Sequence, residues 1–415
     1  MSSLLLFIVQ ATLVIVSARL IGLMARRLRQ PMVIAELVAG IALGPSLLGW
    51  LAPGVEAAVF PAHSLGQLSI VSQVGLLLFM FLVGLEFDPA MLRARARAAV
   101  TISHSSILVP FGLGLLFAVI VYPGLSPPSV PFRSFAMFMG VSMSITAFPV
   151  LARILSEQRM LRSEIGTMAI ACAAVDDITC WCVLAFILAL VRATTLTGAV
   201  VTVVLAVGYT ALMLGFVRRL ASHFAARMPA VSSQGLVAIA ILSIFASSAI
   251  TELIGIHAIF GAFLCGTVIP RERGLPRRIA GKLEDVVEAF MLPLFFAFSG
   301  LRTELGLLDH ARDWLVCALV IAVACLGKFG GSVMAARLSG FGWREASAIG
   351  ILMNTRGLVE LVVLNIGYDL GLVSPTLFTM LVIMALVTTF MTSPLLRWIY
   401  PAGPPAPPPL HLGDG

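Results

Sequence analysis

Two adjacent carboxylates, Asp176 and Asp177, lie halfway along a stretch from Ser163 to Val191 that is otherwise almost wholly apolar. An ionisable side chain near the centre of a bilayer is costly, about 2.5–3.5 kcal/mol for aspartate on insertion scales. Such a pair must therefore face protein or a water-filled cavity rather than lipid. Because intramembrane acids commonly mark proton or ion pathways, the sequence predicts a proton or cation site here.

The composition of the chain agrees with a membrane setting. Of its 415 residues 60% are hydrophobic and only 11% are charged, and the mean hydropathy is +1.05, whereas a soluble domain has about 25% charged residues. Since a spanning helix needs about 20 apolar residues, we predict an all-α polytopic protein with about thirteen transmembrane helices and a disordered, proline-rich tail at 401–415. The predicted spans are 4–25, 31–50, 65–85, 98–121, 134–154, 163–191, 196–217, 233–252, 256–270, 286–301, 313–337, 344–367 and 374–399.

The positive charges predict how these spans are oriented. Most of the 27 lysines and arginines fall in loops on one side of the membrane, and the positive-inside rule assigns that side to the cytoplasm. The N-terminus is then outside and the C-terminus inside. Topology also explains the net charge of +7, so no nucleic-acid partner is expected. The six cysteines lie within spans and lack metal-ligand spacing, so no cofactor is predicted.

Two of the predicted spans carry features that interrupt a helix. The fifth contains Pro149 near its middle, where proline removes a backbone donor and clashes with the preceding turn. The twelfth contains the run Asn-Thr-Arg-Gly at 354–357, at a similar depth. Interrupted spans in matching positions of two halves predict an inverted repeat with two crossing broken helices, and the ion site of such a transporter lies at the crossing.

Charged residues of neighbouring spans are placed to reach that crossing. Lys328 lies near the middle of the eleventh span, at the depth expected for Asp176 and Asp177. Adjacent helical residues diverge by about 100°, so the two acids must have different neighbours. We predict that Asp177 binds the cation or the proton, that Asp176 and Lys328 form a titrating pair, and that Thr146 is a neutral oxygen ligand. A buried carboxylate that holds either H⁺ or a metal ion can exchange one for the other.

Three further charged residues are candidates for supporting roles. Arg356 and Glu360 are one helical turn apart, so they are predicted to pair and to neutralise the half-helix ends at the breaks. Glu36 is a candidate second proton site, with a packing contact as the alternative. A structural alternative also exists for Arg356 with Glu360, and a fold-specifying ion pair is the alternative for Asp176 with Lys328.

Several motifs resemble one family of transporters. They are Gln-Pro-Met-Val-Ile-Ala-Glu at 30–36, Ser-Ile-Thr-Ala-Phe-Pro-Val-Leu-Ala-Arg at 144–153 and Met-Asn-Thr-Arg-Gly-Leu-Val-Glu-Leu at 353–361. They resemble the second branch of the monovalent cation:proton antiporter superfamily. Within it, the chain looks most like the transport domain of plant cation/proton exchangers and their bacterial Kef-type relatives, over roughly residues 30–400.

The resemblance implies a homodimer in which a six-helix core domain slides against a dimerisation domain and carries its ion by an elevator motion. We place the membrane transport domain at 1–400, with core helices at about 65–191 and 286–399 and dimerisation helices at about 4–50 and 196–270. Asp177 matches the cation-binding aspartate of the family, and Lys328 matches its basic residue on the symmetry-related helix. The glutathione-gated relatives have a C-terminal nucleotide-binding regulatory domain. We expect no such domain in this chain, and therefore no regulation by its ligands.

These observations predict a transporter rather than an enzyme: an antiporter that exchanges H⁺ for Na⁺ or K⁺ in a bacterial inner membrane. The sequence does not distinguish the two metal ions. One alternative is a passive cation channel that uses the same acids as a selectivity site. Another is an organic-anion symporter with the same broken-helix architecture, and a lysine at position 328 paired with an acid argues against it.

Overall fold

Helices are the only regular elements among the residues described by the computed structural model, which are 2–28, 30–86, 96–158, 160–161, 163–192, 196–227 and 233–400. The helices are α1 Ser3–Arg27, α2 Met32–Leu43, α3 Leu48–Leu51, α4 Pro53–Val59, α5 Leu65–Glu86, α6 Ala96–Leu125, α7 Phe132–Ser144, α8 Phe148–Glu157, α9 Glu164–Arg192, α10 Leu196–Leu212, α11 Arg218–Arg227, α12 Ser233–Ile254, α13 Ala258–Thr267, α14 Leu275–Val286, α15 Leu292–Leu301, α16 Ala311–Leu338, α17 Trp343–Met353, α18 Leu358–Asp369 and α19 Pro375–Ile399. Two π-helical turns, Met213–Val217 and Val287–Met291, join α10 to α11 and α14 to α15. The predicted tail at 401–415 lies outside the described residues.

Ten helical segments within the described part of the chain are long and apolar enough to cross a membrane. This makes the protein an integral membrane protein, but the predicted count of thirteen spans is not confirmed. The three remaining predicted segments contain shorter helices. Two of them are the interrupted pairs α7/α8 and α17/α18, and the third is α13, which has only 10 residues.

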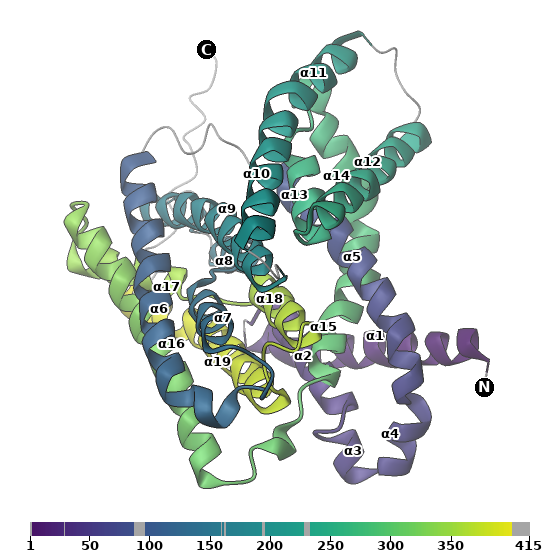
Figure 1. Ribbon diagram of the computed structural model, residues 1–415, viewed down its shortest axis with the longest axis vertical. Coiled ribbons are helices and arrows are strands. Elements are labelled where there is room, and N and C mark those ends of the chain that lie inside the picture. Colours follow the sequence, from purple (N-terminus) through teal and green to yellow (C-terminus); the bar gives the residue numbers. More distant parts are fainter. Residues whose placement is uncertain are drawn as a thin grey trace, which may run out of the picture.

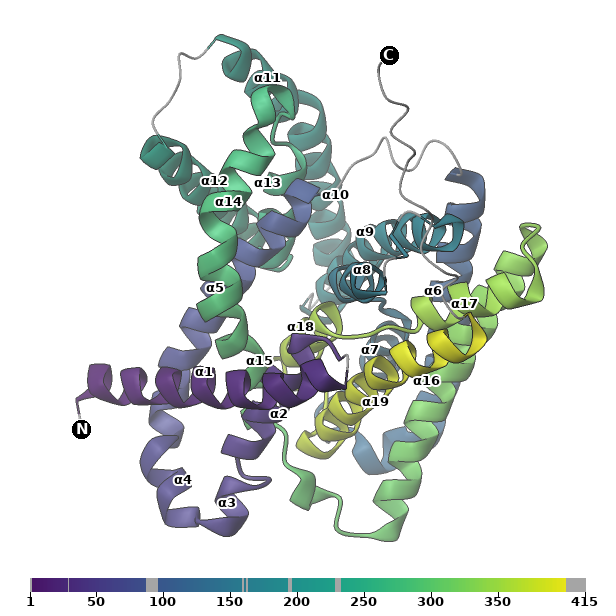
Figure 2. The same ribbon diagram turned by 180° about the vertical axis from the view of Figure 1, so that it is seen from behind.

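The helices form two groups that lie side by side in Figures 1 and 2. The crossing bundle contains α6–α9 and α16–α19; in it, α6 packs against α7, α9 and α16, and α17 packs against α9, α16 and α19. The flanking bundle contains α1–α5 and α10–α15; in it, α13 packs against α5 and α12, and α15 packs against α2 and α5. The two bundles meet where α9 contacts α10, where α15 contacts α18 and where α2 contacts α19.

Glycines allow some of these helices to approach very closely. A Cβ atom added to Gly40 of α2 would lie 2.1 Å from the carbonyl oxygen of Ala297 on α15. A Cβ atom added to Gly266 of α13 would lie 2.2 Å from the carbonyl oxygen of Phe81 on α5. Small residues at such contacts are typical of membrane helices, which associate through close backbone packing.

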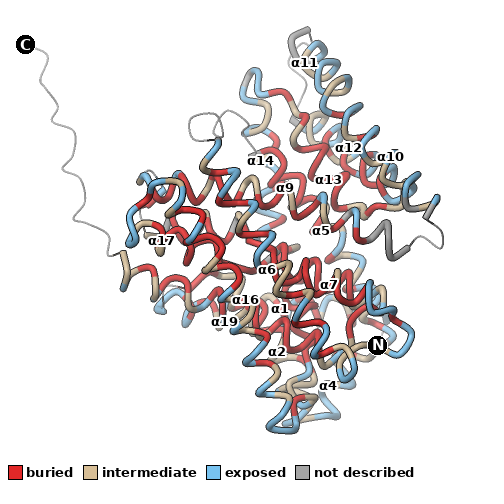
Figure 3. Tube along the Cα trace, turned by 60° about the vertical axis from the view of Figure 1, so that its left-hand side comes forward, coloured by how far each residue is buried: buried red, intermediate tan, exposed pale blue. Residues whose placement is uncertain are grey.

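Burial is greatest where the elements of the crossing bundle converge, and exposed residues lie on the outward faces of the helices (Figure 3). All of the residues from 138 to 147 are buried, in α7 and the segment that follows it. By contrast, α10 exposes a row of large apolar side chains, including Val200, Val204 and Val207. Such an apolar outer surface suits contact with lipid, whereas the polar groups described below lie inside.

Candidate functional site at the crossing of two broken helices

The first break separates α7 from α8, as the sequence predicts. After Ser144 the backbone becomes extended at Ile145, with φ −73° and ψ 137°, and helical structure resumes at Phe148. Pro149 is the second residue of α8, a position at which the missing N–H of proline costs no helical hydrogen bond. The proline therefore begins the second half-helix rather than ending the first.

The second break separates α17 from α18 and depends on a glycine. Gly357, directly before α18, has φ +152° and ψ −121°, a conformation that residues with a side chain rarely adopt. A Cβ atom at this position would also lie 2.8 Å from a methyl group of Val150 on α8. Close packing of the two breaks thus adds to the backbone reason for glycine here.

The two breaks are joined directly to each other. The backbone N–H of Ala147 donates to the carbonyl oxygen of Thr355 over 3.0 Å, and the hydroxyl oxygen of Thr146 lies 3.1 Å from the carbonyl oxygen of Met353. Segments more than 200 residues apart in the chain therefore meet, as an inverted repeat with crossed broken helices requires. The predicted meeting of the two interrupted spans is thus confirmed.

Charged side chains sit at the half-helix ends that the breaks create. The guanidinium of Arg356 donates to the carbonyl oxygens of Ser142 and Met143 over 2.7 and 2.6 Å, at the C-terminal end of α7. It also forms a 2.7 Å ion pair with Glu360, which lies in the first turn of α18. A cation at a helix C-terminus and an acid at a helix N-terminus each oppose the partial charge of that end. The predicted pairing of Arg356 with Glu360 is thus confirmed as a contact.

Asp176 is held by hydrogen bonds from two other helices and from the break between α7 and α8. Its carboxylate accepts from Ser103 over 2.8 Å and from Ser106 over 3.0 Å, both on α6, and from the Thr146 hydroxyl at the first break. It also forms a 2.7 Å ion pair with the ammonium of Lys328 on α16. Since Asp176 and Lys328 are both fully buried, each charge is compensated inside the bundle.

Lys328 is likewise fully hydrogen-bonded. Its ammonium donates to the carbonyl oxygens of Ser106 and Ser144 as well as to Asp176, and an ammonium group has three hydrogens. Ser144 is the last residue of α7, so Lys328 places a second positive charge at the end of that half-helix. The charges of Lys328 and Asp176 therefore compensate each other at the crossing.

Asp177 differs sharply from its neighbour. Only 3% of the residue is exposed, yet neither carboxylate oxygen has a hydrogen-bond partner among the described residues. The backbone N–H of Phe148 approaches the carboxyl group from the N-terminus of α8 without reaching normal hydrogen-bonding geometry. Because nearly all buried polar groups in proteins are satisfied, two orphaned carboxylate oxygens mark a place for a proton or a cation.

The other predicted site residues lie as follows. Thr146 belongs to the crossing, but its hydroxyl is directed to Asp176 and Met353, so a ligand role toward Asp177 stays a prediction. Glu36 is 5% exposed on α2 of the flanking bundle, and its role as a second proton site also stays a prediction. Ser103 and Ser106 were not predicted; their three-residue spacing, which puts both on one face of an apolar helix, is the signal that would have found them.

The crossed broken helices and the buried acid–lysine cluster define a secondary transporter of the antiporter fold. The chain belongs to the sodium/hydrogen exchanger family, because the family model for the transmembrane sodium/hydrogen exchanger matches residues 14–399. The predicted resemblance to cation:proton antiporters is therefore confirmed.

Named relatives agree with this assignment. The chain is 45% identical over 404 residues to the Na⁺/H⁺ antiporter NhaS4 of Synechocystis, covering 97% of this chain and 98% of the relative. It is 41% identical over 406 residues to cation/H⁺ antiporter 19 of Arabidopsis thaliana and 35% identical over 412 residues to K⁺/H⁺ antiporter 1 of Saccharomyces cerevisiae. Those two alignments cover 97% and 96% of this chain but only 50% and 47% of the relatives, so the chain spans about half their length.

A solved structure shares the fold. The sodium proton antiporter MjNhaP1 from Methanocaldococcus jannaschii superposes with a TM-score of 0.71 at 15% sequence identity. The match covers 95% of this chain and 96% of that chain. The described helices thus follow the antiporter architecture over nearly the whole chain.

Proposed function

We propose that the protein is a secondary active antiporter that exchanges H⁺ for a monovalent alkali cation, Na⁺ or K⁺, with Asp177 as the shared carrier. The observation that carries this proposal is the buried Asp177 carboxyl group, which has no hydrogen-bond partner in the described part of the chain, next to the paired Asp176. Relatives named as Na⁺/H⁺ and K⁺/H⁺ antiporters support it. Nothing in these similarities favours the passive channel.

The chemistry follows from the different surroundings of the two acids. Asp176 already has a cation and three hydroxyl donors, so it has little to gain from a metal ion. Asp177 has neither, and a buried carboxylate is stable only when it is protonated or paired with a cation. Arrival of a metal ion therefore displaces the proton, and arrival of a proton displaces the metal ion. This competition couples the two fluxes.

Oxygen atoms for the metal ion come from the crossing in this proposal. Hard monovalent cations prefer carboxylate, carbonyl and hydroxyl oxygens. The Asp177 carboxylate would supply the charge, and Thr146 and backbone carbonyls freed by the break would add neutral oxygens. Asp176 and Lys328 would keep the rest of the site electrically neutral while the occupant of Asp177 changes.

Alternating access would arise from motion of the crossing bundle against the flanking bundle. Arg302, at the C-terminal end of α15, is one polar link between them, since it donates to Asn365 over 3.1 Å and forms a 2.7 Å ion pair with Asp369, both on α18. Such a contact between moving bodies would have to open and reform in each cycle. In this scheme α5 and α15 belong to the flanking bundle. The moving core is then smaller than the core helices predicted at about 65–191 and 286–399.

We further propose thirteen membrane crossings, which count α13 and each interrupted pair as one span. The N-terminus would be outside and the C-terminus cytoplasmic, in a bacterial inner membrane, and two copies would form a homodimer through the flanking bundle. A bacterial relative of nearly the same length supports the localisation.

Transport into liposomes tests the function. Purified protein is reconstituted with a pH-sensitive dye inside, the membrane potential is clamped at zero, and a gradient of Na⁺, K⁺ or Li⁺ is imposed. We expect the wild type to move protons uphill and Asp177→Asn to fold but not exchange. Asp176→Asn is the matched control and should retain some exchange. Cation flux without proton movement would show a channel, and full activity of Asp177→Asn would refute the assignment of the carrier.

A further inference from the structure

One exposed side of α1 carries two arginines for which the transport mechanism has no use. Arg19 and Arg26 are both exposed, and in the sequence of α1 they are the only charged residues before its last position, Arg27. Within the described part of the chain neither guanidinium has a hydrogen bond or an ion pair. Arg19 is eight residues before Arg27, so its Cα atom lies about 12 Å from the end of the helix.

Such a position requires a partner for the charge. A helix of 25 residues is about 37 Å long, longer than the hydrocarbon core of about 30 Å. Arg19 therefore enters the apolar layer, where arginine is rare unless it pairs with another group or reaches the headgroups. No acidic side chain supplies that pair among the described residues, and an anionic group of the surrounding bilayer can supply it.

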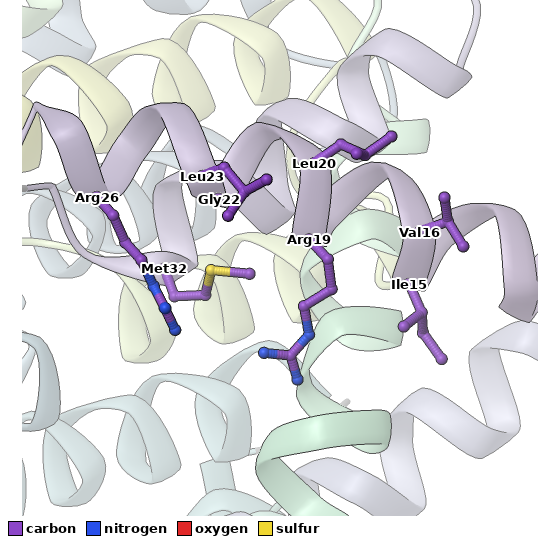
Figure 4. Close-up of a pocket in the computed structure, with 8 residues that line it drawn as sticks. All are labelled: Ile15, Val16, Arg19, Leu20, Gly22, Leu23, Arg26 and Met32. Atoms are coloured by element: carbon purple, nitrogen blue, oxygen red, sulfur yellow. The ribbon is translucent and has the colours of Figure 1, made fainter.

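A cavity of about 400 Å³ lies between the two arginines. Figure 4 shows both side chains leaving α1 on the same side, with Met32 of α2 between them. Seven residues separate the arginines, which is close to two helical turns and about 10.5 Å along the axis. Met32 packs on Gly22, where an added Cβ atom would lie 2.6 Å from its sulfur atom, and so forms the floor of the cavity.

The remaining walls are apolar and exposed. Leu20 and Leu23 are each 60% exposed and Val16 is 50% exposed. None of the eight residues that line the cavity is acidic. The cavity thus offers two guanidinium groups for an anion directly beside a hydrocarbon surface.

We propose that this cavity binds one anionic phospholipid, with its phosphate between Arg19 and Arg26 and its acyl chains along the apolar residues of α1. Guanidinium binds phosphate through paired, charge-assisted hydrogen bonds, and basic pockets on the cytoplasmic side of membrane helices suit such headgroups. A second copy of this chain fits less well. Meeting the same face about a twofold axis, it would bring its own arginines toward these two.

Lipid retention and thermal stability test the proposal on the purified full-length protein. Phosphatidylglycerol or phosphatidylcholine is added in detergent, bound lipid is counted by native mass spectrometry, and the Tm is measured. We expect the wild type to retain phosphatidylglycerol and to unfold at a higher temperature with it than with phosphatidylcholine. The double variant Arg19→Gln/Arg26→Gln should lose this retention by about tenfold or more, which corresponds to one lost charge-assisted hydrogen bond.

Two controls keep the interpretation specific. Arg218→Gln/Arg219→Gln removes two exposed arginines of α11 and should leave retention unchanged. Soluble glycerophosphoglycerol, the headgroup without acyl chains, should not raise the Tm at the same concentration. The proposal is wrong if the first double variant retains phosphatidylglycerol like the wild type, if the soluble headgroup stabilises equally, or if that variant changes only the dimer fraction.

Discussion

Removing Lys328 alone should destabilise the protein strongly, because the change leaves a charged or newly protonated Asp176 in a fully buried site. The ammonium contacts Asp176, the carbonyl oxygens of Ser106 and Ser144, and the hydroxyl oxygen of Ser106. Breaking a buried pair by removing one partner typically costs about 3–5 kcal/mol. Lys328→Met keeps the unbranched chain as far as Cε and removes only the ammonium nitrogen, so most of the loss comes from the charge and its hydrogen bonds rather than from a cavity.

The expected loss of stability can be expressed as a decrease in the melting temperature, Tm. Taking about 2.1 cal/mol/K of unfolding entropy per residue over 415 residues, a loss of about 3–5 kcal/mol corresponds to a Tm lower by about 3–6 °C. The double variant Asp176→Leu/Lys328→Met removes both charges together. It should lie closer to the wild type than Lys328→Met does, because a buried ion pair can often be replaced by apolar residues at little cost.

The assay is thermal unfolding of the purified variants in one detergent, followed by intrinsic fluorescence, with Asp176→Leu included to complete the double-mutant cycle. A coupling energy near zero would refute the reasoning. So would a Tm for Lys328→Met within 1 °C of the wild type. Either result would mean that the two charges do not compensate each other in the folded protein.

Three further variants test the supporting contacts. Gly357→Ala should lower the stability by about 1–3 kcal/mol, because a side chain would have to adopt a strained backbone conformation. Its Cβ atom would also lie 2.8 Å from a valine methyl group of α8. A Tm equal to that of the wild type in thermal unfolding would contradict this. Arg356→Gln should lower the Tm more than Glu360→Gln does, because the arginine also holds two carbonyl groups of α7, and the reverse order would show that those bonds contribute little. Arg302→Gln should change stability by less than about 1 kcal/mol, since its partner Asp369 is partly exposed, but it should change the exchange rate in liposomes, and an unchanged rate would exclude this contact as a moving link between the bundles.

Much of the site was accessible from residue types and spacing. The breaks follow from Pro149 and from the polar run that ends at Gly357, and the pair of Arg356 with Glu360 follows from a spacing of one helical turn. These are local signals that depend on neighbouring residues and on well-understood backbone preferences. The predicted depth of Lys328 also agrees with its contact to an acid.

The remaining features depend on how distant helices rotate against one another. Periodicity separates Asp176 from Asp177 by about 100° but does not say which of them faces Lys328, 152 residues away along the chain. The spacing of Ser103 and Ser106 marks one polar face of α6, but only the packing of α6 against α9 brings that face to Asp176. The number of spans also depends on the packing of distant helices. A helix as short as α13 is stabilised by its neighbours as well as by its own hydrophobicity.

Proton release on cation binding tests the central claim most directly. Detergent-purified protein in weakly buffered solution with a pH dye is titrated with NaCl or KCl, and choline chloride controls for ionic strength. If one carboxyl group holds either a proton or a metal ion, the wild type should release protons as the transported ion saturates the site. Asp177→Asn should release none, while Asp176→Asn should still respond. Cation binding without proton release in the wild type, or equal release from Asp177→Asn, would contradict the account.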